Sequence, residues 1–122
     1  MTRHRDEVYL RHMPSHAREA VSILDGRPRE ELAGSRILQL ALLHLVEIVG
    51  EAASKVSQDA QASMQQLPWR AMIAMRNRII HGYDTVNVQV LWDTIVHDLP
   101  RLAGDLEAIL GECGDSGRAT EE

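Results

Sequence analysis

The sequence predicts an all-α protein, an antiparallel bundle of four to five main helices. Hydrophobic residues make up 44% of the 122 residues, yet phenylalanine is absent and aromatic residues contribute 3%, so the core must be aliphatic. Apolar residues recur at steps of three and four over long stretches, which is the period of an amphipathic helix. A chain of this length forms one domain, near the size at which a second subunit adds stability.

The first helix is predicted over residues 6–24, where the helical period is kept by Leu10, Met13, Ala17, Ala20, Val21 and Leu24. Pro14 interrupts this stretch. Proline lacks the amide donor and clashes with the preceding turn, at a cost of roughly 3 kcal/mol, so a kink or break is expected just before it. A turn at 25–28 leads into one short helix over 28–33.

Residues 35–56 form the longest apolar stretch and are predicted to be the central helix, with Ser35 as its N-cap. Gly50 inside this helix costs roughly 1 kcal/mol relative to alanine, which favours a close approach of another helix at that point. The helix is not expected to cross a membrane, because one polar seam runs along it at steps of three and four: His44, Glu47, Glu51 and Lys55.

Two interpretations of this polar seam are open. In the first it is a solvated face on which Glu51 and Lys55 form a weak ion pair. In the second, Glu47 or Glu51 faces the helix predicted over residues 68–84 and orients the polar side chains there.

The stretch 68–84 is predicted to be a helix that begins at Pro68, with a buried stripe of Trp69, Met72, Ile73 and Ile80. Gly82 is expected to be the left-handed residue that ends it, which places His81 in the last turn. Four polar side chains would then converge at this helix end: Arg76, Asn77, His81 and Tyr83.

Residues 58–66 are expected to form a loose helix, and the last helix is predicted over 88–109 with Asn87 as its N-cap and a restart at 98–100. Gly111 ends the apolar pattern. We therefore expect a domain of residues 1–110 and a disordered tail of residues 111–122.

Charge and cysteine content restrict the class of protein. Thirteen basic and eighteen acidic side chains give a formal charge of −5, which argues against sequence-blind coating of nucleic acid, so any RNA contact must be local. A single cysteine excludes an intrachain disulfide framework, and neither cysteine nor histidine spacing indicates a metal site or another cofactor. The amino terminus has no apolar signal segment, so a cytoplasmic location is expected.

The run of residues 76–83, RNRIIHGY, resembles the R-x4-H-x-Y signature of the HepT-like toxins, a branch of the HEPN superfamily also known as DUF86. Residues 46–53 are similar to that family's I-x-G-E-A block, residues 67–69 to its P-W entry, and residues 90–100 to its last helix. These blocks occur in order along nearly the whole chain, which makes the resemblance much more specific than the short motif alone.

The resemblance implies a HEPN-type bundle and a metal-independent endoribonuclease with Arg76, Asn77 and His81 as its catalytic residues. It further implies the toxin of a type VII HepT/MntA-like toxin–antitoxin pair. In such pairs an MNT-type nucleotidyltransferase antitoxin adds AMP to the motif tyrosine, here Tyr83. A phenol at this position could instead serve only to hold the cleft by a hydrogen bond.

The residue chemistry agrees with RNA cleavage. The reaction needs a base for the 2′-hydroxyl proton, an acid for the leaving oxygen, and positive charge at the phosphate. Histidine titrates near neutrality and the arginine fork matches phosphate oxygens. One His81 cannot fill both proton-transfer roles at once, so a homodimer that pairs two copies of the motif is expected.

Alternatives remain at single residues and for the whole protein. Asn77 either fixes His81 or touches substrate, and Arg78 is expected to be a surface charge. The alternative function is a non-catalytic helical subunit that binds a nucleotidyltransferase as a scaffold or substrate-binding module, with the same cleft holding nucleotide phosphate.

Overall fold

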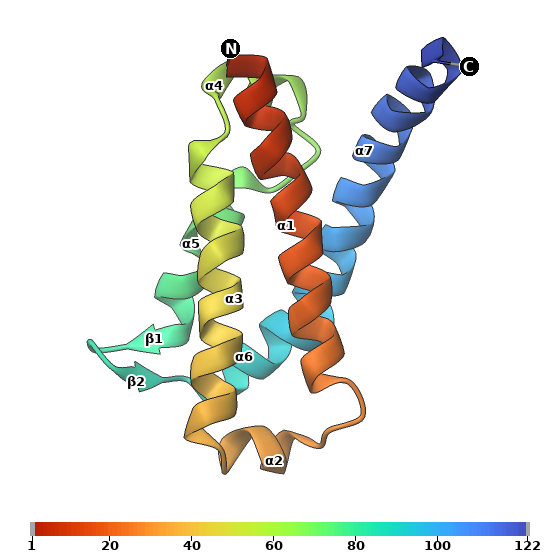
Figure 1. The fold of residues 1–122 in the computed structure, drawn as a ribbon. Helices are drawn as coiled ribbons and strands as arrows, with labels where there is room; N and C mark the ends of the chain where they lie inside the picture. Colours follow the sequence, from red (N-terminus) through yellow and green to blue (C-terminus); the bar gives the residue numbers. More distant parts are fainter. Residues whose placement is uncertain (1, 122) are drawn as a thin grey trace.

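The computed structural model describes the backbone of residues 2–121 and the side chains of residues 5–111. Its main helices run alternately up and down as an antiparallel bundle, which confirms the all-α prediction (Figure 1). They are α1 (Thr2–Leu24), α3 (Arg36–Lys55), α5 (Trp69–Ile79) and α7 (Leu99–Glu121). The shorter elements are α2 (Arg29–Ala33), α4 (Gln58–Ser63), β1 (Ile80–His81), β2 (Thr85–Val86), α6 (Val88–Asp93) and the π-helical turn η1 (Thr94–Asp98).

The core is aliphatic, as predicted, and α3 lies at its centre between α1 and α5. Fully buried side chains come from all four main helices, among them Met13, Leu42, Val49, Met72 and Leu99. Burial at this scale stabilises by about 1.5–3 kcal/mol for each large aliphatic side chain, so the bundle is held mainly by helix-on-helix packing.

α1 is continuous through Pro14, so of the kink or break predicted just before that residue the break is wrong. Both Met13 and Pro14 are buried, and Ala17 one turn later is also fully buried. Packing of this face against the other helices offsets the backbone hydrogen bond that proline cannot donate.

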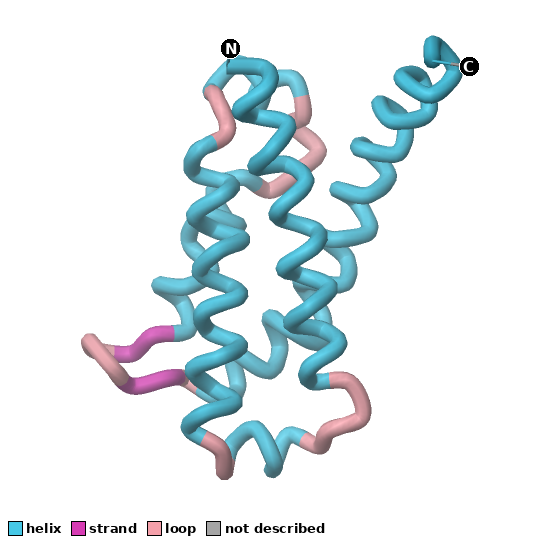
Figure 2. The backbone as a smooth tube through the Cα atoms, viewed as in Figure 1, coloured by secondary structure: helices cyan, strands magenta, loops and turns pink. Residues whose placement is uncertain are grey.

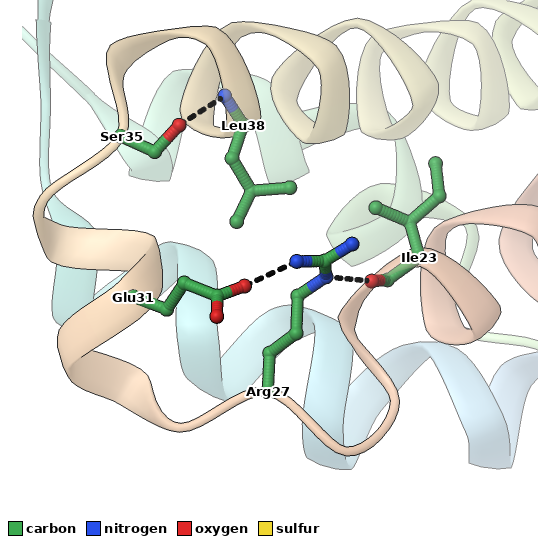
Figure 3. Close-up of polar contacts among 5 residues, drawn as sticks. All are labelled: Ile23, Arg27, Glu31, Ser35 and Leu38. Atoms are coloured by element: carbon green, nitrogen blue, oxygen red, sulfur yellow. Dashed lines mark hydrogen bonds and ion pairs between the residues drawn. The ribbon is translucent and has the colours of Figure 1, made fainter.

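The corner between α1 and α3 is closed by local polar contacts (Figure 3). Nε of Arg27 donates to the carbonyl of Ile23 at 2.7 Å, which satisfies one of the free carbonyls at the end of α1, and the same guanidinium pairs with Glu31. Ser35 caps α3 as predicted, because its hydroxyl accepts from the backbone N–H of Leu38 at 3.1 Å.

α5 is shorter than predicted and is followed by a hairpin, the only strand structure in the described backbone (Figure 2). The helix ends at Ile79, and Ile80 is extended with φ −82° and ψ 127°. Ile80 pairs with Val86 across the hairpin, and the N–H of Asn87 donates to the carbonyl of Ile79 at 2.7 Å. β-Branched side chains on both strands favour this pairing over another helical turn.

The buried stripe of α5 also differs from the prediction. Met72, Met75 and Ile79 are buried, whereas Ile73 is 42% exposed and Ile80 is only partly buried. The buried residues still follow steps of three and four, but their stripe lies on a slightly different side of the helix than predicted.

In the C-terminal region α7 begins at Leu99, within the restart predicted at 98–100, but the chain stays helical across this point. Asn87 caps α6, since its side chain accepts from the N–H of Val90 at 3.1 Å. Asp98 is not an N-cap: it lies in η1, where the hydrogen-bonded turn widens just before Pro100. A π-type turn at this point accommodates the missing amide N–H of Pro100 without interrupting the helix.

α7 continues through Gly111, so the helix end predicted there is wrong. Gly111 has no left-handed φ and lacks the conformation of a helix-terminating glycine. Beyond the bundle the helix extends away from α1 (Figure 1). The assignment of residues 111–122 to a separate tail stays a prediction.

α3 is long and apolar enough to span a membrane by length and composition, with a mean hydropathy of 1.5 over its most apolar window. Half of this apolar stretch is buried inside the bundle, and core helices of soluble proteins can be equally long and apolar.

Candidate functional site

A surface groove of about 610 Å³ lies between α1, α3 and α5. The four residues of the polar seam on α3 line it. The lining side chains that carry polar groups or rings are Tyr9, His12, His44, Glu47, Glu51, Ser54, Lys55, Arg76 and Asn77. Carboxylates, cations and an amide therefore meet in one groove within a single chain.

Gly50 sets how closely α3 and α5 approach beneath this groove. A Cβ atom at this position would lie 3.0 Å from the backbone carbonyl oxygen of Met72 and 3.5 Å from that of Ile73. The predicted close helix approach at Gly50 is confirmed. It brings the seam of α3 within reach of side chains on α5.

Arg76 reaches across this approach to Glu47. Its Nε donates to Oε2 of Glu47 at 2.7 Å, and both side chains are about half exposed. Oε1 of the same carboxylate lies 3.6 Å from Nδ1 of His44. Glu51 instead lies 3.8 Å from Nζ of Lys55. Each interpretation of the seam thus describes one of its two carboxylates, Glu47 facing α5 and Glu51 pairing along α3.

The structure brings only two of the four motif residues into the groove. Arg76 and Asn77 line it, whereas His81 lies on β1 and Tyr83 in the hairpin turn, and neither is a lining residue. The predicted placement of His81 in the last helical turn is wrong, because the chain leaves the helix two residues earlier. Helical spacing therefore does not relate Asn77 to His81, or Arg76 to Tyr83.

The hairpin that carries His81 and Tyr83 is small and exposed. His81 pairs with Thr85, and Gly82 has φ +77°, the left-handed conformation predicted for it, here used to turn a hairpin. Nη2 of Arg36, at the start of α3, donates to the carbonyl of Asp84 at 3.2 Å. Tyr83 is 91% exposed, and its hydroxyl has no hydrogen-bond partner among the described residues.

Sequence patterns missed two residues of the groove on α1, Tyr9 and His12. Neither has a spacing that relates it to α3 or α5, so only the packed structure brings them to the groove. His44 was part of the polar seam, and it lies by Glu47 one turn along the same helix. The contact of Glu47 with Arg76 could not be predicted without the position of α5.

Over residues 5–111, no three His, Cys, Asp or Glu side chains lie close enough to hold a metal ion together.

Comparison with known proteins identifies the family. Residues 13–109 match the family model described as ribonuclease HepT-like. A relative from Thermococcus cleftensis named "Probable ribonuclease HepT" is 34% identical over 95 residues, 75% of this chain and 86% of its own length. A protein of Caldanaerobacter subterraneus subsp. tengcongensis named "Putative RNase" is 28% identical over 102 residues, 84% of this chain and 91% of that one. No solved structure matches. The chain belongs to the ribonuclease HepT-like family.

Proposed function

We propose that this HepT-like protein is a metal-independent endoribonuclease that acts in the cytoplasm as the toxin of a type VII toxin–antitoxin pair. Arg76, Asn77 and His81 are its proposed catalytic residues. The observation that carries the proposal is that this motif is exposed, within six residues of chain, in a protein of a ribonuclease family.

The proposed reaction is attack of a ribose 2′-hydroxyl on the adjacent phosphorus, with departure of the 5′-oxygen of the next nucleotide. His81 of one copy would accept the hydroxyl proton and His81 of a second copy would protonate the leaving oxygen. Arg76 would stabilise the charge on the phosphate oxygens, and Asn77 would either bind substrate or fix the imidazole.

A homodimer follows from this division of roles. Support for it comes from the exposure of the side chains that would meet: Arg76, Asn77, His81 and Tyr83 all lie at the surface. Pairing two motifs would also double the local positive charge on a protein whose formal charge is −5.

Expression and cleavage assays test the ribonuclease. Wild type should stop growth and cleave a labelled single-stranded RNA in EDTA, whereas His81→Ala and Arg76→Ala should do neither. His97→Ala and Arg101→Ala are matched controls, because both residues are exposed and neither lines the groove. If wild type is harmless and leaves RNA intact, the non-catalytic nucleotidyltransferase-binding subunit becomes the better assignment.

We further propose that a partner nucleotidyltransferase silences the enzyme by AMPylation of Tyr83. The phenolic oxygen would attack the α-phosphorus of ATP, release pyrophosphate and give up its proton to the partner's base or to solvent. A side chain that is 91% exposed on a hairpin turn is accessible to a second active site. The added negative charge would compete with RNA phosphate for Arg76.

Mass spectrometry tests this modification. After incubation with the partner and ATP, the intact mass should rise by whole AMP units and RNA cleavage should fall in parallel. Tyr83→Phe should keep its mass, while Tyr9→Phe should be modified like wild type. An unshifted wild type, or a shift that persists in Tyr83→Phe, would contradict the proposal.

A further inference from the structure

We propose that Glu47 is a positioning residue for Arg76, and that it holds the guanidinium so that its two terminal nitrogens face the substrate phosphate. This inference rests on the proposed ribonuclease activity and adds to it a residue that lies outside the R-x4-H-x-Y motif, 29 positions earlier in the chain.

The contact between the two residues uses one edge of the guanidinium. Nε of Arg76 donates to Oε2 of Glu47 at 2.7 Å, a short charge-assisted hydrogen bond between α5 and α3. Among the described residues, Nη1 and Nη2 of Arg76 have no other acceptor. A guanidinium anchored through Nε keeps four N–H donors, enough for bidentate binding of two phosphate oxygens.

Glu47 is selected over Glu51 by the structure. In the block of residues 46–53, which is similar to I-x-G-E-A, the glutamate of the pattern is Glu51. That carboxylate lies by Lys55, whereas the carboxylate one turn earlier reaches Arg76. Because Gly50 lets α5 approach α3 to contact distance, Glu47 and Arg76 are held by two packed helices rather than by a loop.

Positioning and simple electrostatics predict effects of neutralising Glu47 on different kinetic parameters. A carboxylate in the groove repels RNA phosphate, so removing its charge alone should tighten RNA binding. If Glu47 restrains Arg76 for the transition state, removing it should instead lower kcat, because a misplaced catalytic group loses rate steeply with distance.

The first experiment compares steady-state, multiple-turnover cleavage of a labelled single-stranded RNA 20-mer by wild type, Glu47→Gln and Glu51→Gln. We expect kcat to fall roughly tenfold to a hundredfold in Glu47→Gln, with KM unchanged or lower. Glu51→Gln should lower KM without that loss of kcat. Equal behaviour of the two variants would overturn the assignment, because both remove one negative charge from the same groove.

A double-mutant cycle then asks whether Glu47 acts through Arg76. Lysine keeps the charge at position 76 but has no Nε–H and no fork. If the two residues act together, Glu47→Gln should cost little further rate in an Arg76→Lys background. Independent, multiplying losses would place the effect of Glu47 elsewhere.

A control variant and an NMR measurement distinguish the positioning role of Glu47 from a general effect of losing an ion pair, and from the ribonuclease proposal on which it rests. Glu107→Gln removes an exposed ion pair with Arg18 away from the groove and should leave cleavage unchanged. In protein labelled with 15N-arginine, the Nε–H signal of Arg76 should be shifted and slow to exchange in wild type and lose both features in Glu47→Gln. If the Nε–H signal of Arg76 is the same in wild type and Glu47→Gln, the positioning role of Glu47 is wrong, even if wild type cleaves RNA. If the signal moves but wild type does not cleave RNA, only the ribonuclease proposal is wrong.

Discussion

The groove and the hairpin hold the two halves of the motif on unlike supports. Arg76 and Asn77 stand on α5, a helix anchored by Met72, Met75 and Ile79, three buried side chains. The hairpin that follows has two residue pairs and buries only Val86, and its turn residues are exposed. Two-stranded hairpins of this size are marginally stable on their own, so the local stability of the motif falls steeply at Ile80.

This contrast suggests a division of work between the two regions. A phosphate-binding arginine needs a fixed position, which packed helices supply. An acceptor tyrosine must enter the active site of another protein, and an exposed turn suits that requirement. His81 lies between the two regions, two residues after the end of α5 and directly before the turn glycine, Gly82.

The largest expected effect comes from disturbing the helical support at Gly50. Gly50→Ala adds a Cβ atom 3.0 Å from the carbonyl oxygen of Met72, and both atoms belong to packed helices. Helix propensity would gain about 1 kcal/mol, but the overpacking costs about 1–3 kcal/mol and pushes α5 from α3. We expect a net loss of up to about 2 kcal/mol in the free energy of unfolding, measured by urea denaturation, and slower RNA cleavage.

Gly104→Ala is the matched control in α7, where an added Cβ meets nothing within 4 Å. There the propensity gain is unopposed, so stability should rise by about 0.5–1 kcal/mol with cleavage unchanged. A Gly50→Ala protein that is also stabilised would show that α5 yields easily, and the claim of a rigid support would then be wrong.

A smaller effect is expected at the hairpin. Gly82 has φ +77°, and an alanine there would pay about 1–2 kcal/mol for the left-handed conformation. Because the hairpin contributes little to the core, this strain should open the turn rather than unfold the bundle. We expect a small change in Tm but a clear loss of RNA cleavage and of AMP transfer to Tyr83.

Gly26→Ala provides the same strain elsewhere, since Gly26 has φ +78° and open space around it in the turn after α1. It should lower Tm and leave both activities unchanged. If Gly26→Ala and Gly82→Ala affect the two activities equally, the hairpin conformation has no special role.

Periodicity and capping chemistry predicted most of the helical framework. The central helix was expected over residues 35–56 and is observed as Arg36–Lys55, with Ser35 as its cap. Asn87 was likewise recognised as a cap, because a short polar side chain before an apolar run is a strong local signal.

The hairpin could not be predicted in the same way. Ile79 and Ile80 fit a helix or a strand equally well, and strands of two residues are too short to show a period. Gly82 was correctly expected to be left-handed, but a left-handed glycine ends a helix and turns a hairpin alike. Half of the predicted site was consequently placed on the wrong element.

The groove was beyond sequence reasoning for a different reason. Its lining comes from three helices whose relative rotation and spacing follow from the whole core. Glu47 and Glu51 looked equivalent along α3, and only the position of Arg76 on α5 distinguishes them.

The smallest expected effect lies outside both regions, in the ion pair of Arg18 with Glu107. Arg18 donates through Nε and Nη2 to both carboxylate oxygens of Glu107, at 3.0 and 2.7 Å. Arg76, by contrast, donates to Glu47 through Nε alone. The hydrogen bonds from Arg18 lower the pKa of Glu107 below its ordinary value of 4.5. Because both side chains are nearly half exposed, the stabilisation is small.

The sign of its pH dependence follows from the lowered pKa. Glu107 binds a proton more readily in the unfolded chain, so its contribution is present above pH 4.5 and is lost as the pH falls through the folded-state pKa. Glu107→Gln should therefore lower Tm slightly at pH 7, and the difference from wild type should shrink and then vanish as the pH falls below the folded-state pKa of Glu107. A difference that persists in acid would mean that Glu107 stabilises the fold by packing and not through its ion pair with Arg18.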